Sequence, residues 1–598
     1  MEYVLLKTHW ERTKVSVLKA MAAALVASFS VCASADVARF SPYDNVRTFS
    51  DAEIVDGAIS ARPGGVLREG LLGSFDSLNI LSFPGVFPQR LPLIHDSLFV
   101  ASQREPNALY GLLAKSIHVA PDFSTARIEL DDRARWHDGT PITAWDVEFT
   151  FETVLTNSSP VFRRSLGGLS IEVHDSQSFT LRSTQKGDWL WLRAAATFPI
   201  HSRVHWSQRE PDRATLDPPL GSGPYRIEEL DAGRQLQLEK VENYWAADHP
   251  INRNRWNFDA VISEYFTDPV ARSQALAIGE LDIIRETDAG RWQNGYSGPA
   301  VSRGDVVRSE IMDPSSIAVP ALFFNVRRPL FQDARVRKAI ALSIDIDFLL
   351  ELTGNVYVPA ASYFGSASWA ADGPPSPAEA ALIEPLDGQL SRSFFTSSAP
   401  TVVGVDQPAR KRLREASRLL EAAGFSVRNG VLIDPATGEQ VIIELVVADR
   451  AIARRLAPLV EWLAQLGITL NIVTPDATVI SQIRATHQFD MIFISLSHTE
   501  LPGFLENFFW HSRFKDTGFS VAGLESDVVD ALIDKMQSSR AVAEIEAAAR
   551  AFDRFLRWEA LVIPLWQQNE AWFVHRKGLA VPKDLTWGIS PAVTWYWE

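Results

Sequence analysis

The sequence predicts an α/β protein whose mixed β-sheets are covered by helices and divided among two or three lobes. The chain has 598 residues, which is too long for one compact hydrophobic core. Segments with strand-like alternation are followed by segments with helical spacing, and this βαβ-like rhythm favours sheets flanked by helices. The composition is globular, with 46% apolar and 22% charged residues.

The first 35 residues have the features of an export signal. A basic stretch (residues 7–19) precedes an apolar run (residues 20–31). Ala33-Ser34-Ala35 then supplies the small-x-small pattern of a signal-peptidase site, so we expect cleavage after Ala35. The apolar run is too short to span a bilayer permanently. The mature protein is therefore expected in the periplasm.

The only cysteine, Cys32, lies inside this segment. Cleavage would leave a mature chain without a thiol, which excludes internal disulfides, cysteine nucleophiles and cysteine-rich metal sites. As an alternative, Cys32 could be a lipoprotein anchor, but Val31 precedes it where such a site has Gly, Ala or Ser. Cleavage also removes four basic and two acidic residues and changes the formal charge from −15 to −17. An acidic surface disfavours nucleic acid as a partner.

The first half of the chain supplies the following elements in order. A short strand and a turn are expected in residues 64–80, and alternating apolar residues predict another strand in residues 126–139. A helix from Ala144 to Leu155 should be opened by Thr143 as N-cap, with Asp146 three residues later.

A boundary follows in residues 216–224, where three prolines and two glycines cannot continue a helix. A strand is expected from Tyr225 to Leu230. Residues 271–284 predict a short helix that Gly279 stops, and then a further strand.

The second half repeats this rhythm. Asp333 is expected to cap a helix, because Val336, Ala339, Ile340 and Ile344 fall near helical spacing.

Three further elements complete the second half. Residues 407–424 form a charged amphipathic pattern ended by Gly424. Residues 453–473 predict one helix, stopped by Gly467, and then a strand. Residues 489–496 have the continuous apolar character of a buried strand.

Four motifs occur together in this order: WHDGTPITAWDVEFTFE (136–152), GSGPYRI (221–227), ENYW (242–245) and FFNVRRPLFQDARVRKAIALSID (323–345). With them the chain closely resembles the peptide and nickel class of extracellular solute-binding proteins (family 5), the periplasmic receptors of ABC importers. Residues 362–386 and 504–514 and the C-terminal TWYWE resemble the oligopeptide and microcin C-type branch of that class.

The resemblance implies a type II periplasmic-binding-protein-like fold with three lobes and a hinged cleft. Lobe I would be discontinuous, lobe II would be an insert, and two strands would cross between lobes I and III. The expected boundaries are 36–92, 219–320 and 562–598 for lobe I, 93–218 for lobe II and 321–561 for lobe III, with crossings at Ala321–Val326 and Leu561–Trp566.

The resemblance also implies a function. The chain would bind oligopeptides or modified peptides, such as microcin C-like or cell-wall peptides, and deliver them as a monomer to an inner-membrane ABC permease and its ATPase. It would use no cofactor and no metal and catalyse no reaction. The alternatives are a non-peptide cargo (an opine or sugar-phosphate conjugate, a metal complex or haem), an exported peptide or cell-wall hydrolase, and a sensory or chaperone-like binder.

We expect solute contacts where strands end or where lobes meet. Hydroxyl, aromatic and charged side chains at such positions can hold a peptide's polar and apolar groups. The candidates are Phe75, Asp76, Asn325, Ser362, Tyr363, Phe364, Ser495, Ser497, His498, Glu500, Trp510 and Trp566. Each has a structural alternative, because Trp and Tyr often serve as core with one polar atom satisfied, and Asn325 could simply tie down the crossing backbone.

The chain departs from the family pattern at one place. Related dipeptide and oligopeptide receptors have an aspartate after the strand that corresponds to residues 489–496, where it pairs with the ligand's free α-amine. Here the sequence continues as Ser495-Leu496-Ser497-His498-Thr499-Glu500, with Glu500 as the nearest acid. A blocked or modified N-terminus is therefore easier to accept in this chain.

Other chemistry has weaker support. His201 and His205 are four residues apart, but the glutamate of a zinc-protease motif is missing, which favours packing over metal binding. The segment Gly365–Trp369 approaches a nucleophile elbow but lacks its closing glycine. No P-loop pattern is present.

Overall fold

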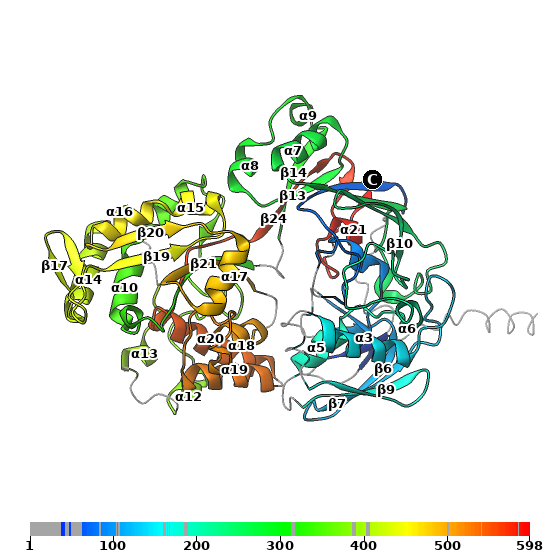
Figure 1. The fold of residues 1–598 in the computed structure, drawn as a ribbon, viewed down its shortest axis with the longest axis horizontal. Helices are drawn as coiled ribbons and strands as arrows, with labels where there is room; N and C mark the ends of the chain where they lie inside the picture. The colour runs from blue at the N-terminus through cyan, green and yellow to red at the C-terminus, as the bar shows by residue number, and fades with distance from the viewer. Residues whose placement is uncertain are drawn as a thin grey trace, which may run out of the picture.

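The computed structural model describes residues 37–41, 47–49, 63–82, 85–102, 105, 108–158, 163, 166, 168–184, 189–312, 317–385, 390, 392–401, 407–498, 502–539, 541–583 and 585–598. The predicted export signal and Cys32 lie outside these ranges. Within them the chain forms two bodies, each built on a mixed sheet and joined by a pair of crossing segments (Figure 1).

The first body is built on a seven-stranded sheet with the order β10-β11-β12-β3-β13-β24-β14. Its strands come from three separate parts of the chain: β3 (Val66–Leu72), β10 (Tyr225–Asp231), β11 (Gln235–Lys240), β12 (Ala260–Phe266), β13 (Ile283–Glu286), β14 (Val306–Met312) and β24 (Glu570–Arg576). β3 pairs in parallel with β12 and β13, and the other pairs are antiparallel. Helices α7 (Pro269–Ile278), α8 (Ala289–Asn294) and α9 (Pro299–Ser302) follow β12 and β13.

Alternation along these strands buries both faces of this sheet. Ile284 and Val574 pack with Leu276 of α7, whereas Ile283 and Phe573 pack with Trp595 of the C-terminal segment. That segment contains β25 (Leu579–Ala580), α21 (Pro591–Thr594) and β26 (Tyr596–Trp597).

Two four-stranded sheets complete the first body, in the orders β6-β7-β9-β8 and β2-β1-β5-β4. Their elements are β1 (Val37–Phe40), β2 (Arg47–Phe49), β4 (Phe99–Ala101), β5 (Leu109–Gly111), β6 (Ala114–Val119), β7 (Thr125–Leu130), β8 (Ser170–Val173), β9 (Ser178–Arg182), α3 (Ala144–Asn157), α5 (Leu190–Ala196) and α6 (Arg203–Trp206). The predicted helix start is confirmed: Thr143 and Asp146 form a capping box at the beginning of α3.

Two of the sequence motifs hold this region to the seven-stranded sheet. Glycine is required at position 223 because a Cβ there would lie 2.6 Å from the Leu93 carbonyl oxygen. In ENYW, the Tyr244 hydroxyl and the Trp245 indole donate to the buried Asp96 carboxylate at 2.8 and 2.7 Å. Burial raises the pKa of Asp96 to about 7, although these hydrogen bonds act in the opposite direction.

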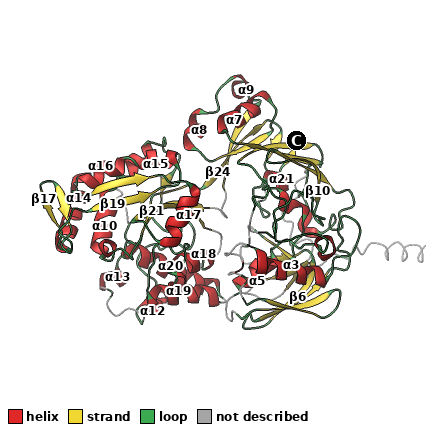
Figure 2. Cartoon of the chain, viewed as in Figure 1, coloured by secondary structure: helices red, strands yellow, loops and turns green. Residues whose placement is uncertain are grey.

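The second body is built on a five-stranded sheet with the order β20-β19-β21-β15-β22. Its strands are β15 (Ile317–Phe324), β19 (Ile442–Val446), β20 (Thr469–Val473), β21 (Met491–His498) and β22 (Val562–Pro564). Helices cover both faces (Figure 2). They are α10 (Ala334–Ser343), α11 (Ile346–Glu351), α12 (Pro377–Ile383), α13 (Arg392–Thr396), α14 (Ala409–Ala422), α15 (Arg450–Leu456), α16 (Pro458–Ala464), α17 (Ala477–Thr486), α18 (Phe504–Trp510), α19 (Asp527–Ser538) and α20 (Val542–Trp558).

Most predicted elements of this body are confirmed, with one correction. Asp333 caps α10, and Gly424, with a φ of 95°, follows the end of α14. The single helix predicted in residues 453–466 is wrong: the structure has α15 and α16, with Pro458 at the first position of α16. Proline has no N–H to continue the hydrogen-bond ladder of α15, and its ring is accommodated at a helix start.

Two segments cross between the bodies side by side. The Leu565 N–H donates to the Pro320 carbonyl at 2.9 Å, and Ala318 forms an isolated bridge with Gln568. β23 (Trp566–Gln567) also pairs with β16 (Val358–Pro359). The segments Ala321–Val326 and Leu561–Trp566 lie mainly inside the five-stranded sheet, so the crossing itself is displaced by several residues toward the first body.

Candidate functional site

A cavity of about 440 Å³ lies against the crossing segments, between the two bodies. We call it the hinge cavity. It is lined from the first body by Arg285, Glu286, Thr287, Glu570 and Ala571, from the second body by Ala318, Pro320, Tyr357, Asp449, Ile452, Arg455, Phe493 and Ser495, and from the crossing by Trp566 and Gln568. Residues from both bodies therefore share one solvent-accessible space, the position in which closure could enclose a solute.

One wall of the hinge cavity is aromatic. Tyr357 stacks on Trp566, with ring centroids 6.0 Å apart and an interplanar angle of 22°. Tyr357 also stacks on Trp572 of β24, which in turn stacks on Trp292 of α8. Phe493 packs against Trp566 at 6.2 Å. The rings form a continuous column from one body to the other, and stacking of this kind adds to the stability that burial provides.

A cation lies on this wall. The Arg455 guanidinium carbon is 5.5 Å from the Tyr357 ring centroid and 5.4 Å from the Trp566 centroid. These distances are in the range of cation–π attraction. Burial raises the pKa of Tyr357, while the charge of Arg455 and a hydrogen bond with it act in the opposite direction.

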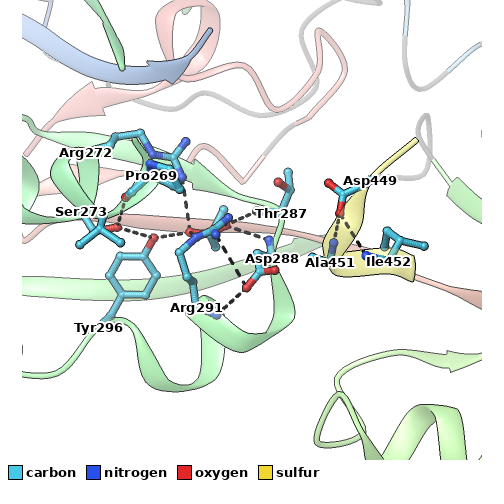
Figure 3. A network of polar contacts seen from close by, with 12 residues as sticks. Pro269, Arg272, Ser273, Thr287, Asp288, Arg291, Tyr296, Asp449, Ala451 and Ile452 are labelled. Atoms are coloured by element: carbon cyan, nitrogen blue, oxygen red, sulfur yellow. Dashed lines mark hydrogen bonds and ion pairs between the residues drawn. The ribbon is translucent and has the colours of Figure 1, made fainter. Parts of the chain in front are cut away.

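The opposite wall is the turn that carries Thr287 and Asp288 (Figure 3). The Glu286 carboxylate holds this turn. Glu286 ends β13, is fully buried, and accepts from the Tyr296 hydroxyl at 2.5 Å and from Arg291 at 3.0 and 3.1 Å. Its Oε1 also accepts from the backbone N–H groups of Thr287 and Asp288, each at 2.8 Å. These bonds fix the turn that carries Thr287 at the surface of the cavity.

Charge around Glu286 is balanced inside this network. Burial would raise the pKa of Glu286, but hydrogen bonds from Arg291 and Tyr296 hold it below its ordinary value. Arg272, also buried, lies 3.4 Å from the same carboxylate. The Glu286 carboxylate is therefore fully used by contacts within the protein and is not available to bind a charged solute.

Thr287 faces the start of α15 across the cavity (Figure 3). There Asp449 caps the helix by accepting from the N–H groups of Ala451 and Ile452 at 2.6 and 3.0 Å. Ser495 is exposed in the middle of β21, opposite Pro320 of β15. Hydroxyl and carboxylate groups from both bodies are thus available to a polar solute.

Two of the twelve sequence candidates, Ser495 and Trp566, line the hinge cavity. Ser497 and His498 lie at the end of β21, paired with Ala318 and Ile317 of β15. Glu500 lies outside the described residues.

The structure gives the remaining candidates internal partners. Asn325 donates to the carbonyls of His487 and Phe489, so it ties down the chain after β15. Asp76 is exposed and accepts from the Val86 N–H at 2.6 Å. Phe75 is buried and packs edge-on against the Tyr265 ring.

The loop containing Ser362, Tyr363 and Phe364 is also internal. The buried Asp553 of α20 accepts from the Ser362 hydroxyl at 2.8 Å and from the Tyr363 N–H at 2.9 Å. Tyr363 and Phe364 are each 1% exposed and Trp510 is fully buried, all in one aromatic core. Seven of the candidates are buried, and Trp566 is the one of them that lines the hinge cavity. The other six, which were expected in the cleft, lie in the core and outside the lining of this cavity: Phe75, Asn325, Ser362, Tyr363, Phe364 and Trp510.

Sequence reasoning missed Tyr357, Asp449 and Arg455. Asp449 had a signal, because an aspartate that follows an apolar strand and precedes a helix is both a cap and a cleft residue. Tyr357 and Arg455 are brought together only by the fold.

A second cavity of about 310 Å³ shares Arg285 with the hinge cavity. It is lined by β3, β13 and Phe573 on one side and by residues 587–591 on the other. At its edge, Arg90 pairs with the buried Glu69 through two hydrogen bonds of 2.6 Å. Arg285 is the residue that lines both cavities.

The two histidines singled out in the sequence, His201 and His205, pack against neighbouring rings. His201 is buried against the His95 ring, with centroids 4.3 Å apart. Among the described residues, no group of three or more His, Cys, Asp or Glu side chains could hold a metal ion. Within the same ranges, none of the helices has the length and apolar character needed to cross a bilayer.

Comparison with known proteins relates this chain to a protein family. A sequence model of the bacterial extracellular solute-binding proteins, family 5 (middle region), matches residues 108–516. YejA of Escherichia coli K12, described as uncharacterized, is 30% identical over 547 residues, with 90% of each chain covered. YejA of Agrobacterium fabrum, described as a probable peptide-binding protein, is 29% identical over 607 residues, with 98% of each chain covered.

A solved structure shares the fold. The oligopeptide-binding protein AppA of Bacillus subtilis, in complex with a nonapeptide, superposes with a TM-score of 0.65 at 16% identity and covers 90% of this chain and 100% of its own. At this identity the likeness shows the fold alone. The α/β fold of the periplasmic-binding-protein type that the sequence predicts is confirmed.

Proposed function

We propose that this chain, which belongs to the bacterial extracellular solute-binding proteins of family 5, is the peptide receptor of an ABC importer. The observation that carries the proposal is the hinge cavity, in which an aromatic wall and several polar side chains from two bodies meet beside paired crossing segments. The name of the Agrobacterium fabrum relative, a probable peptide-binding protein, supports a peptide as the solute.

The mechanism is closure of the two bodies around the solute. The crossing segments act as the hinge, and hinge closure around ligand is a known mode for periplasmic binding proteins. The solute must bind the closed form better than the open form, because only such a difference can shift the equilibrium. Ser495 and Trp566 are the sequence candidates that we keep as contacts, and to them we add Tyr357 and Arg455.

The organisation expected from the sequence remains part of the proposal. The exported chain would begin after Ala35, act in the periplasm as a monomer and present its closed form to an inner-membrane permease and its ATPase. The lobes would comprise 36–92, 219–320 and 562–598 (lobe I), 93–218 (lobe II) and 321–561 (lobe III), except that all of β15 and β22 would belong to lobe III, in whose sheet they pair. The solute would be released unchanged, without catalysis.

The experiment is a thermal-shift series with four classes of solute: free peptides, N-formylated peptides, cell-wall peptides and metal chelates. A solute that binds only the folded protein raises its melting temperature in proportion to the logarithm of its concentration above Kd. We expect this rise with peptides. A rise with metal chelates alone would replace the peptide with another cargo, and recovery of cleaved peptide would identify a hydrolase.

A further inference from the structure

Arg455 differs from the buried arginines of the same body. Arg337, Arg412, Arg554 and Arg557 each lie 2.9–3.5 Å from a carboxylate oxygen of Glu559, Asp345, Glu379 and Asp553, respectively. Among the described residues, Arg455 forms no ion pair: no carboxylate oxygen lies within 4.0 Å of its guanidinium nitrogens. Its charge is held by ring faces and directed to a cavity.

The rings position this guanidinium without neutralising it. Tyr357 is 8% and Trp566 2% exposed, so the platform below Arg455 is rigid and largely dry. A guanidinium has five N–H donors in a planar fork that matches a carboxylate. The ring contacts occupy the face of this fork and leave its N–H donors for an acceptor.

The other charges of the hinge cavity leave room for such an acceptor. Glu286 is compensated by Arg272 and Arg291 behind the wall. Of the two remaining acids, Asp449 already accepts two backbone N–H groups at its own helix start. Glu570 belongs to the other body and has no ion pair among the described residues. Arg285 and Arg455 are the two cations that line the cavity, and of these Arg455 lies on the aromatic wall.

We infer that Arg455 binds the carboxylate of the solute, so that a peptide lies with its C-terminal end at the hinge and its apolar side chain against Trp566. This inference rests on the proposed function, because it names the charged end of a peptide that the same cavity would take. It also gives a physical meaning to the missing aspartate after β21: the charge-selective contact of this chain is to the acid end of the solute.

The test compares a pool of short synthetic peptides with free C-terminal acids against the same pool as C-terminal amides. Native mass spectrometry and calorimetry measure the affinity of each form for the full-length mature protein. A charge-assisted hydrogen bond is stronger than a neutral one, so amidation should weaken binding to the unmodified protein about tenfold or more. In Arg455→Gln the acid should bind no better than the amide.

Two further variants make the result specific. Arg454→Gln removes a charge from the exposed neighbouring position of α15 and should keep the full acid-to-amide ratio. Arg455→Lys retains the charge but loses the planar stack, and should keep part of the ratio. Arg455→Lys also provides the test if Arg455→Gln does not fold. An acid-to-amide affinity ratio in Arg455→Lys that is lost completely, or that is unchanged, would contradict a planar charged contact.

Two outcomes overturn the inference and are distinct. If the unmodified protein binds acids and amides equally, or if Arg455→Gln keeps the preference for acids, Arg455 does not bind the carboxylate although the receptor still takes peptides. If neither peptide form binds, the proposed function is wrong and the inference falls with it.

Discussion

Replacement of Asp553 by asparagine should destabilise the second body while leaving the hinge cavity in place. The Asp553 carboxylate is fully buried in α20 and accepts from the Ser362 hydroxyl, the Tyr363 N–H, the Ala371 N–H and the Arg557 guanidinium at 2.8–3.2 Å. Asp553 thereby holds the loop of Ser362, Tyr363 and Phe364, which the sequence analysis expected to contact the solute.

The magnitude follows from the two oxygen atoms. Oδ1 accepts from Ser362 and Tyr363, and an amide oxygen can continue to do so. Oδ2 accepts from Ala371 and Arg557, and an amide nitrogen there would present a donor to two donors. Arg557, 6% exposed, would lose its anionic partner. Breaking a buried pair by removing one member costs about 3–5 kcal/mol of the free energy of unfolding.

Hydrogen exchange and denaturant unfolding of the second body measure this loss. Glu546→Gln is the control, because Glu546 is half-buried on the same helix and has no ion pair among the described residues, so its change should stay within about 0.5 kcal/mol. If Asp553→Asn leaves stability intact but abolishes peptide binding, the loop contacts the solute directly and its assignment to the core is wrong.

Three further predictions concern the rest of the molecule. Burial lowers the pKa of His201 to about 3 and that of His95 well below its ordinary value. Each histidine therefore contributes to the free energy of unfolding above pH 6.5, and this contribution is lost as pH falls. Burial raises the pKa of Asp96 to about 7, so its effect on stability has the opposite pH dependence. Between pH 6 and 4 the two histidines should lower the free energy of unfolding as pH falls, with Asp96 opposing them, and His201→Gln should make this fall smaller. If hydrogen exchange gives the same pH dependence for His201→Gln and the unmodified protein, His201 is not a buried neutral group. Trp566→Ala should cost about 3–5 kcal/mol in a denaturant titration and weaken peptide binding, and retained stability would show that the ring column is not packed as described. Gly223→Ala should cost about 1–3 kcal/mol and raise exchange around residues 93–96, while Gly279→Ala, whose added Cβ meets no atom within 4 Å, should change exchange only at the end of α7.

The sequence predicted what depends on local patterns. Thr143 with Asp146 and Asp333 were recognisable as helix starts, and both cap helices in the structure. Gly279 was recognisable as a helix stop, and its φ of 88° is the left-handed conformation that glycine adopts most readily. Pro458 was overlooked because the apolar stripe of residues 453–466 continues across it, although its ring ends α15.

The site was harder to predict, because its residues meet only through the fold. Trp566 and Ser495 were found because both lie near crossing strands. Trp510 and Asn325 were assigned to the cleft by the same reasoning, but they lie in the core and do not line the cavity. Residue type and proximity to a strand end do not distinguish a side chain that faces the cavity from one that faces the core. Arg455 was missed for the opposite reason. It is an arginine on the surface of a helix, and nothing in the sequence indicates that it lies over the Tyr357 and Trp566 rings.

Mass spectrometry of the compounds released on denaturing the protein purified from its native periplasm is the most direct test of a receptor that encloses a peptide and releases it unchanged. The account predicts intact peptides with a free C-terminal carboxylate, in an amount approaching one per protein. Release of a metal chelate, a sugar conjugate or peptide fragments from an added intact peptide would contradict it.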